Sequence, residues 1–256
     1  MPKLNFTDQQ IKDLIKGIED GSIDEWNLPK NYYKALVEYL SKGVLEGFSA
    51  TIEDLKDNVL LQELTMNVHM FGAAKTYQEV KEMNALLVDE EGVIRSSREF
   101  NKVARELYDN WNDNWGRTEY NTAVGQSQMA SKWSEIEKQK DVMGSLLYSA
   151  IVDATTSDIC LPLDGMVAKV DDPIWDKVSP LNHFNCRCVL LQVNDEDTMN
   201  NSERLDQVEP LMNPIFINNP GKTGEIFTKD HPYFEVDKEA KDYAKRNFDL
   251  PLPKFE

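Results

Sequence analysis

The spacing of apolar residues predicts several helices in the first part of the chain. Thr7 followed by Gln10 is the pattern of a capping box, in which two residues satisfy each other's free N–H groups where a helix begins. Pro29 fits the first turn of a second helix, where its missing N–H costs nothing. Thr51 with Asp54 marks a third start. The apolar faces expected for the second and third helices are Tyr33, Leu36, Val37 and Leu40, and Leu55, Val59, Leu60 and Leu64.

The helical period continues to about residue 140. Residues 73–87 keep it, and an acidic turn at residues 89–92 interrupts it. Ser96 with Glu99 forms a second capping box, after which apolar residues again recur at helical spacing. A further helix is expected over residues 117–140.

Beyond Gly144 the pattern changes from helical to strand-like. Three short apolar segments, residues 146–154, 166–170 and 188–193, are bounded by turn residues and predict strands. Between the first two, the sequence Leu163-Asp164-Gly165 is typical of a turn, because glycine adopts positive φ without steric cost. Helices followed by strands predict an α+β fold, with a helical N-terminal half and a small mixed C-terminal unit of short strands and long loops.

These changes suggest three regions. Residues 1–140 would be a helical region for contacts with other proteins, residues 141–195 a β unit containing the cysteines and a histidine, and residues 196–256 an irregular tail with a terminal helix over residues 237–248. The acidic stretch 195–209 has the composition of a solvated linker or surface loop.

Charge and composition narrow the function classes. The chain of 256 residues carries a net charge of −17, which opposes tight binding to duplex DNA because DNA affinity depends largely on lysine and arginine. No stretch approaches the ~18 consecutive apolar residues of a membrane span. Three cysteines are too few and odd in number for a disulfide framework, so we expect synthesis in a reducing cytoplasm.

The cysteines and one histidine form the strongest candidate site. Cys160, His183, Cys186 and Cys188 follow the pattern C-x22-H-x2-C-x-C, and thiolates with imidazole are ligands that zinc prefers. If residues 186–188 were a strand, the two cysteines would share a face and Arg187 would occupy the other. The alternative is three buried thiols and a hydrogen-bonded histidine without metal. A disulfide from Cys160 is also possible, although a cytoplasmic pathway disfavours it.

Catalytic patterns are absent from the sequence. It has no H-E-x-x-H zinc motif, no G-x-S-x-G elbow, no P-loop and no G-x-G-x-x-G. His69 lies among apolar residues at helical spacing and fits a packing role, and His231 precedes a proline and fits a turn. We therefore expect no enzyme activity. The alternatives that stay open are a zinc- or thiol-dependent enzyme and an effector protein.

Arg117 and Glu119 begin the last long helix expected in the N-terminal half. Residues two apart on a helix do not face each other, so each would engage a different neighbour. Spacing alone favours an exposed charged helix. Trp111, Trp115 and Trp133 near this helix are expected to anchor a core or an interface.

Three stretches together resemble the Mu F-like minor head protein family, also called the phage head morphogenesis family. They are residues 71–92, 117–133 and 153–188, and the likeness extends over roughly residues 30–195. The third stretch is the most specific. Its family pattern is an aspartate, a cysteine or histidine before an L-D-G turn, and a proline-rich approach to N-C-R-C, which here are Asp153, Cys160, Leu163-Asp164-Gly165, Pro180 and Asn185-Cys186-Arg187-Cys188.

The resemblance implies a structural virion protein. Such proteins are present in a few copies at the portal vertex inside the capsid, enter during procapsid assembly, and are thought to act in head morphogenesis or DNA ejection. The implied partners are the portal protein and a capsid or scaffolding protein. One departure matters: many members carry a second cysteine at the position of Ser157, so a metal site here would recruit His183 in its place.

Overall fold

The structure, a computed structural model, describes residue 4 and residues 6–194 and 201–255, without the side chains of residues 112–114. Its contacts divide the chain into two compact units. The helical unit comprises Met1–Lys42, Thr65–Tyr120 and Pro232–Glu256, and the sheet unit comprises Gly43–Leu64 and Asn121–His231. Helices precede a small antiparallel sheet, so the predicted α+β class is confirmed. The division at residues 140 and 195 stays a prediction.

The long helices begin largely where the sequence predicts. They are α1 (Asp8–Glu19), α2 (Lys30–Phe48), α3 (Val59–Ala85), α4 (Ser97–Asn110) and α5 (Arg117–Gln139), with a π-helical turn, Trp111–Gly116, between the last two. Both capping boxes are present: Thr7 exchanges hydrogen bonds with Gln10 before α1, and Ser96 does so with Glu99 before α4. These side chains satisfy N–H groups that have no partner within the helix.

The prediction that a helix begins at Thr51 is only partly right. Thr51 bonds to Asp54, but the segment Glu53–Lys56 is a single 3-10 turn, and α3 begins later, where Asn58 accepts a hydrogen bond from the Leu61 N–H. The buried face is consequently shifted. Val59 is 68% exposed, whereas the fully buried leucines at the start of α3 are Leu61 and Leu64.

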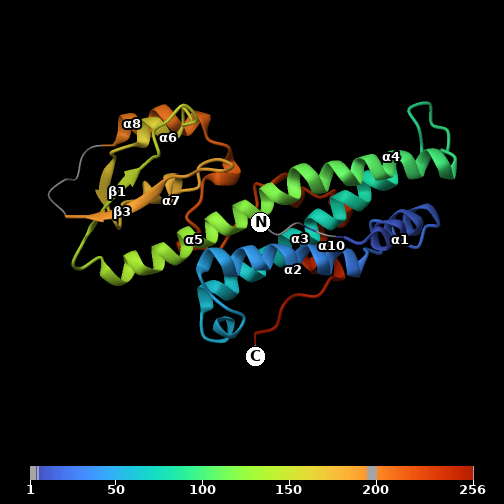
Figure 1. Ribbon diagram of the computed structural model, residues 1–256, viewed down its shortest axis with the longest axis horizontal. Helices are drawn as coiled ribbons and strands as arrows, with labels where there is room; N and C mark the ends of the chain where they lie inside the picture. The colour runs from blue at the N-terminus through green and yellow to red at the C-terminus, as the bar shows by residue number, and fades with distance from the viewer. Residues whose placement is uncertain (1–3, 5, 195–200, 256) are drawn as a thin grey trace. The chain divides into compact units, whose positions relative to one another are not determined.

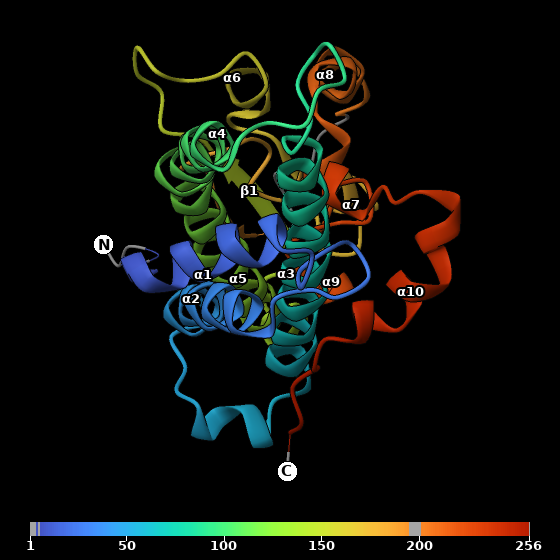
Figure 2. The same cartoon turned by 90° about the vertical axis from the view of Figure 1, so that its right-hand side faces the viewer.

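The core of the helical unit lies between α2 and α3, which run side by side (Figure 2). The predicted face of α2 is buried and contributes Tyr33 and Val37 to this core. Gly72 allows the close approach, because a Cβ at this position would lie 2.5 Å from a methyl carbon of Val37. A second cluster joins α1 and α4 and includes Trp111.

The sheet unit contains three short strands in the order β2-β1-β3, with β1 (Ser145–Ser149) antiparallel to both β2 (Val167–Lys169) and β3 (Val189–Val193) (Figure 1). All three predicted strands are present, although β1 ends at Ser149 and residues 150–154 are irregular. Helix α5 packs against the sheet through Met129, Trp133 and Ile136.

Short elements complete both units. Those in the sheet unit are α6 (Cys160–Leu163), α7 (Trp175–Val178), α8 (Ser202–Val208) and α9 (Pro220–Thr223), with 3-10 turns at Glu209–Leu211 and Pro214–Phe216. The linker predicted over residues 195–209 is wrong for its second part, which forms α8 and buries Val208; residues 195–200 lie outside the described residues. The predicted terminal helix is broken into 3-10 turns, Lys238–Ala240 and Asn247–Asp249, around α10 (Lys241–Lys245), and Pro232–Phe234 forms a further turn.

Three charged side chains are buried together in the helical unit. The ammonium of Lys75 lies 2.6 Å from both carboxylate oxygens of Glu119 and 3.5 Å from Glu79, and Tyr32 donates a 2.8 Å hydrogen bond to Glu79. Lys75, Glu79 and Glu119 are all less than 7% exposed. The exposed charge expected for Glu119 is therefore wrong, because this side chain turns inward to neutralise Lys75, whereas Arg117 is exposed.

The two carboxylates do not share Lys75 equally. Burial raises the pKa of Glu79 to about 7, with Lys75 acting in the opposite direction and Glu119 adding to the rise. Burial opposes the charge on Lys75 as well, but Glu119 and Glu79 together hold its pKa above the ordinary value. Glu119 holds the shorter contact, so Glu79 is the carboxylate that takes up a proton.

We expect Glu79→Gln to stabilise the protein at pH 8 and to change stability little at pH 5. The folded-state pKa of Glu79 lies above its unfolded value, so its contribution is present below pH ~4.5 and is lost as the pH rises through about 7. A neutral amide avoids that loss, worth about 1–3 kcal/mol at pH 8. Urea unfolding at both pH values measures it.

Glu119→Gln is the matched variant, because it removes the same charge from the other partner of Lys75. It should destabilise the protein by about 3–5 kcal/mol, since it leaves a buried ammonium without its close counter-ion. Equal effects of the two substitutions, or a gain for Glu79→Gln that does not depend on pH, would contradict this assignment of charge.

Candidate metal centre

The cysteines and His183 are brought together by one helix and one irregular segment of the sheet unit. Cys160 is the first residue of α6, and His183, Cys186 and Cys188 lie on the irregular segment between α7 and β3. The strand expected at residues 186–188 is wrong, because β3 begins only at Val189 and Asn185 has a φ of 59°, which turns the chain just before Cys186. A turn rather than a strand therefore presents these cysteines.

Three ligand atoms converge closely. The Cys160 sulfur lies 3.2 Å from Nε2 of His183 and 3.7 Å from the Cys186 sulfur, and the ligand atoms of these three residues all lie within 4.8 Å of one another. Two zinc–sulfur bonds of ~2.3 Å at a tetrahedral angle place their sulfurs roughly 3.8 Å apart, and a sulfur and an imidazole nitrogen roughly 3.5 Å apart. The spacing therefore fits a tetrahedral metal site, and all three cysteines are free of disulfides.

The orientation of His183 also suits a ligand. Its Nδ1 lies 2.9 Å from the backbone carbonyl oxygen of Phe184. A proton on Nδ1 donates to this carbonyl, which turns Nε2 toward the sulfurs. Metal-bound histidines are held in this way by a partner on the other ring nitrogen.

Cys188 lies beside this trio. Its hydrogen bonds with Cys160 and Cys186 raise the pKa of its thiol, whereas Cys160, which accepts hydrogen bonds from Cys186 and Cys188, has a lowered pKa. Hydrogen bonds to Cys160 and Cys186 raise the pKa of His183 to about 10. The group whose ligand atoms all lie within 4.8 Å of one another contains Cys160, His183 and Cys186, and the predicted fourth ligand, Cys188, is not part of it.

The surroundings of Cys160 do not suit a nucleophile. The residue is 2% exposed, and the buried Tyr148 hydroxyl lies 3.5 Å from its sulfur. Asn182 donates a 2.8 Å hydrogen bond to the same hydroxyl. His183 is oriented by a backbone carbonyl instead of a carboxylate or amide side chain. This arrangement leaves the Cys160 sulfur mostly covered, although the residue lines a pocket of about 430 Å³ together with His183 and Cys188.

Asp153 and Arg187 of the motif connect the two segments that carry the cysteines. Arg187 holds Asp153 by two hydrogen bonds of 2.8 and 2.9 Å and also donates to Thr155. The hydrogen bonds from Arg187 and Thr155 hold the pKa of Asp153 below its usual range. This clamp ties the loop before α6 to the segment that carries Cys186 and Cys188.

The predicted turn at residues 163–165 fixes α6 against β1. Gly165 has a φ of 75° and its N–H donates to the Tyr148 carbonyl, while the Asp164 carboxylate accepts a hydrogen bond from the Ala150 N–H. Arg204, on α8, donates to the carbonyls of Pro162 and Asp164. Cys160 is thereby held at one end of a braced turn.

Several residues of the site carry no readable signal in the sequence. The fold alone brings Tyr148 to Cys160, Asn182 to Tyr148, and Arg204 to the carbonyl of Pro162 beside Cys160. Arg117 and Glu119, in contrast, belong to the helical unit and are not part of this centre. His69 pairs with the Tyr33 hydroxyl at 3.0 Å, which fits its expected packing role, and His231 lies against the Phe227 ring.

Comparison with known proteins finds a family that part of the chain resembles. Residues 90–191 match the model of the family described as Phage Mu protein F like protein. This region is Mu F-like. No curated protein and no solved structure matches the chain at a significant level.

The match confirms the resemblance noted in the sequence and supports a phage head morphogenesis protein. It covers about two fifths of the chain, from the turn before α4 into β3, and contains Cys160, His183, Cys186 and Cys188. The likeness suggested for residues 30–89 lies outside it. In the described part of the chain, none of the helices combines the length and the apolar character needed to cross a membrane.

If the centre holds zinc, protein purified without chelator should contain about one zinc per chain, measured by elemental analysis. Cys186→Ser and His183→Gln should lose most of the metal and lower the melting temperature by roughly 5–10 °C, because bound structural zinc contributes folding free energy.

His231→Gln is the matched control, since it removes a histidine of the same unit that lies outside the cluster. It should keep the zinc. Metal-free wild-type protein that melts at the same temperature with and without added zinc would show that the residues pack together without a metal.

Proposed function

We propose that this protein is a structural minor head protein, present in a few copies at the portal vertex inside the capsid, where it acts in head assembly and in DNA ejection. The observation that carries the proposal is the Mu F-like match over residues 90–191. Its partners are then the portal protein and a capsid or scaffolding protein, and its locations are the host cytoplasm during assembly and the virion afterwards.

Zinc in this proposal has a structural role. Among the described residues, the sheet unit has three short strands that are joined by long segments with little regular structure. Cys160, His183, Cys186 and Cys188 would join α6 to the segment before β3 through one ion. The low exposure of Cys160 argues against the thiol-enzyme alternative.

Purified heads of the phage that encodes this chain should contain it in far fewer copies than the major capsid protein, as measured by quantitative mass spectrometry. A protein of the vertex is limited by the symmetry of the portal ring. Its absence from heads, or a copy number equal to that of the capsid protein, would refute the proposed position.

Crosslinking within those heads separates the portal contact from a general capsid contact. The helical unit carries exposed lysines at positions 12, 34 and 102, and the sheet unit carries others at positions 169 and 229. If the helical unit binds the portal, crosslinks to portal protein should come from Lys12, Lys34 or Lys102. Crosslinks from Lys169 and Lys229 alone would assign the interface to the sheet unit instead.

Duplex DNA should bind weakly or not at all at physiological salt. The net charge of −17 repels phosphates, and phosphate contacts supply most non-specific affinity. Fluorescence anisotropy with a labelled duplex of mixed sequence measures this at about 0.15 M salt. Sub-micromolar affinity that falls steeply as salt is raised would reveal a basic surface that the net charge conceals.

A further inference from the structure

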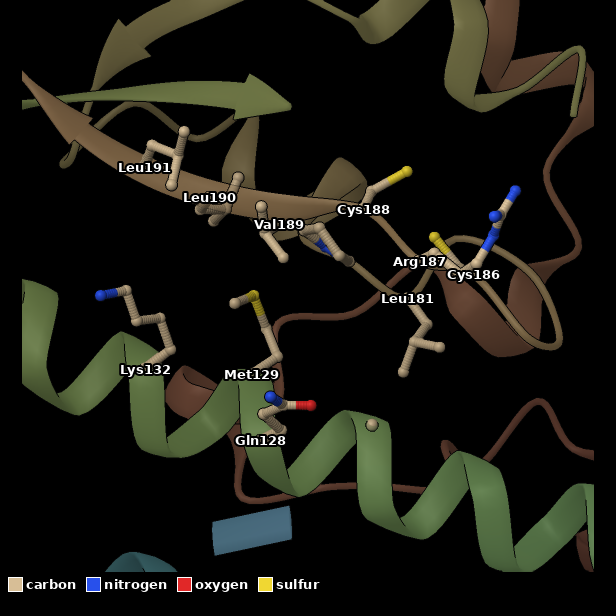
Figure 3. A pocket seen from close by; sticks show the side chains of 12 residues that line it. Gln128, Met129, Lys132, Leu181, Cys186, Arg187, Cys188, Val189, Leu190 and Leu191 are labelled. Carbon is tan, nitrogen blue, oxygen red and sulfur yellow. The ribbon is translucent and has the colours of Figure 1, made fainter. Parts of the chain in front are cut away.

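The metal centre borders a surface pocket of about 430 Å³. Cys160, His183 and Cys188 are among the residues that line this pocket. Cys160 itself is 2% exposed, but Cys186 and Cys188 are half-buried, and their sulfurs both point away from α5 in Figure 3. A molecule as small as hydrogen peroxide can therefore reach the cluster from solvent.

Two of the three sulfurs are placed to form a covalent bond. The Cys160 and Cys186 sulfurs lie 3.7 Å apart, and both thiols are free. Rotation of the two side chains and a small shift of the irregular segment that carries Cys186 bring them within bonding distance. Cys188 is only one residue from Cys186, so a bond between these two would close a small, strained ring. Cys160 with Cys186 is thus the favoured pair.

A bond between Cys160 and Cys186 would join the same two segments as a bound metal. Cys160 begins α6, and Cys186 lies just before β3. A cross-link between distant positions stabilises a fold mainly by restricting the unfolded chain. The ion pair of Asp153 with Arg187 links the same part of the chain, but its side chains are 42% and 45% exposed and it contributes little by itself. The connection therefore depends on the sulfur cluster, whether a metal or a covalent bond closes it.

Two compartments favour two states of the cluster. A reducing cytoplasm keeps thiols reduced, whereas released particles meet oxidising surroundings in which disulfides form and persist. The proposed function places this chain in both, first during assembly and later in the virion. The compartment argument rests on that proposed function, but the chemistry of the cysteine pair does not.

We propose that Cys160 and Cys186 are an oxidative modification site, at which a peroxide converts the thiol pair to a disulfide and releases the metal. The peroxide transfers an oxygen to Cys186, the more exposed of the two, so that its O–O bond breaks and a sulfenic acid and one water form. The Cys160 sulfur then attacks the Cys186 sulfur, the S–O bond breaks, and a second water leaves. Cys160 needs no contact with solvent for this step, because its target is the neighbouring sulfur.

Two electrons pass from the two sulfurs to the peroxide in this reaction. The two thiols supply the two protons that complete the waters. When a metal is bound, the sulfurs are thiolates, so these protons come from solvent and the cation departs as its sulfur ligands are lost. A thiol reductant reverses the change by returning the disulfide to two thiols.

Peptide mapping of the full-length chain tests the pair. Zinc-loaded and metal-free protein are treated with hydrogen peroxide, the remaining thiols are blocked, and unreduced digests are analysed by mass spectrometry. Both forms should contain a disulfide between Cys160 and Cys186, and the loaded form should release about one zinc for each bond. Cys188→Ser is the matched variant, because it removes a cysteine of the cluster and should form the same disulfide.

Wild-type protein gives the answer even if the serine variant does not fold. A cross-link from Cys188, or oxidation of single cysteines to sulfinic acid without a cross-link, would overturn the assignment. A chain that binds no zinc would contradict the metal centre alone, because the metal-free protein still tests the bond.

The stabilising effect of the bond is measured by thermal unfolding. Peroxide-treated, metal-free wild type should melt roughly 5 °C above its reduced form, and Cys186→Ser should show no such rise. An unchanged melting temperature of the wild type would overturn the structural role of the bond.

Heads purified with their thiols blocked test the two compartments. The chain should carry reduced cysteines in freshly lysed host cells and the bond between Cys160 and Cys186 in released particles. Particles that contain the chain with reduced cysteines would overturn the inference for the virion. Particles without the chain would refute the proposed location instead, so the two failures are distinguishable.

Discussion

The convergence of Cys160, His183 and Cys186 is the contact on which the sheet unit depends. The chain from α7 to β3 has no regular structure, yet it must deliver β3 to β1 in register and cover the buried Tyr148. A cluster that joins α6 to this segment limits the conformations that both can adopt. The Asp153–Arg187 clamp ties the loop before α6 to the same segment, and the Asp164 turn holds α6 against the end of β1.

The helical unit depends on a different constraint, which is the neutralisation of Lys75. A buried ammonium is costly unless carboxylates surround it, and Glu119 and Glu79 provide them from α5 and α3. Glu119 also belongs to the stretch at residues 117–133 that resembles the Mu F-like family. One motif of that family thus has a structural role in the helical unit, and the Cys/His motif has one in the sheet unit.

The Mu F-like match therefore contains the elements on which our proposals rest. Helix α5, the metal centre and most of β3 all fall within residues 90–191. The centre and a pocket between β3 and α5 share Cys186, Arg187 and Cys188 along one segment, which leads directly into β3.

The sequence by itself determined the elements whose signals are local. Capping boxes at Thr7 and Ser96, the turn at Gly165 and the three strands were readable, because each depends on residues that are neighbours along the chain. The grouping of Cys160 with His183 could be predicted only because thiolates and imidazole are the ligands that zinc prefers. Tertiary structure decided the features that depend on distant partners. These are the inward turn of Glu119 to Lys75, the contact of Tyr148 with Cys160 and the contact of Arg204 with the turn after α6. The acidic composition after residue 201 suggested a loop, but Val208 packs into the core and the segment forms a helix. Burial against residues far along the chain outweighs local preference in each case, and no local pattern records it.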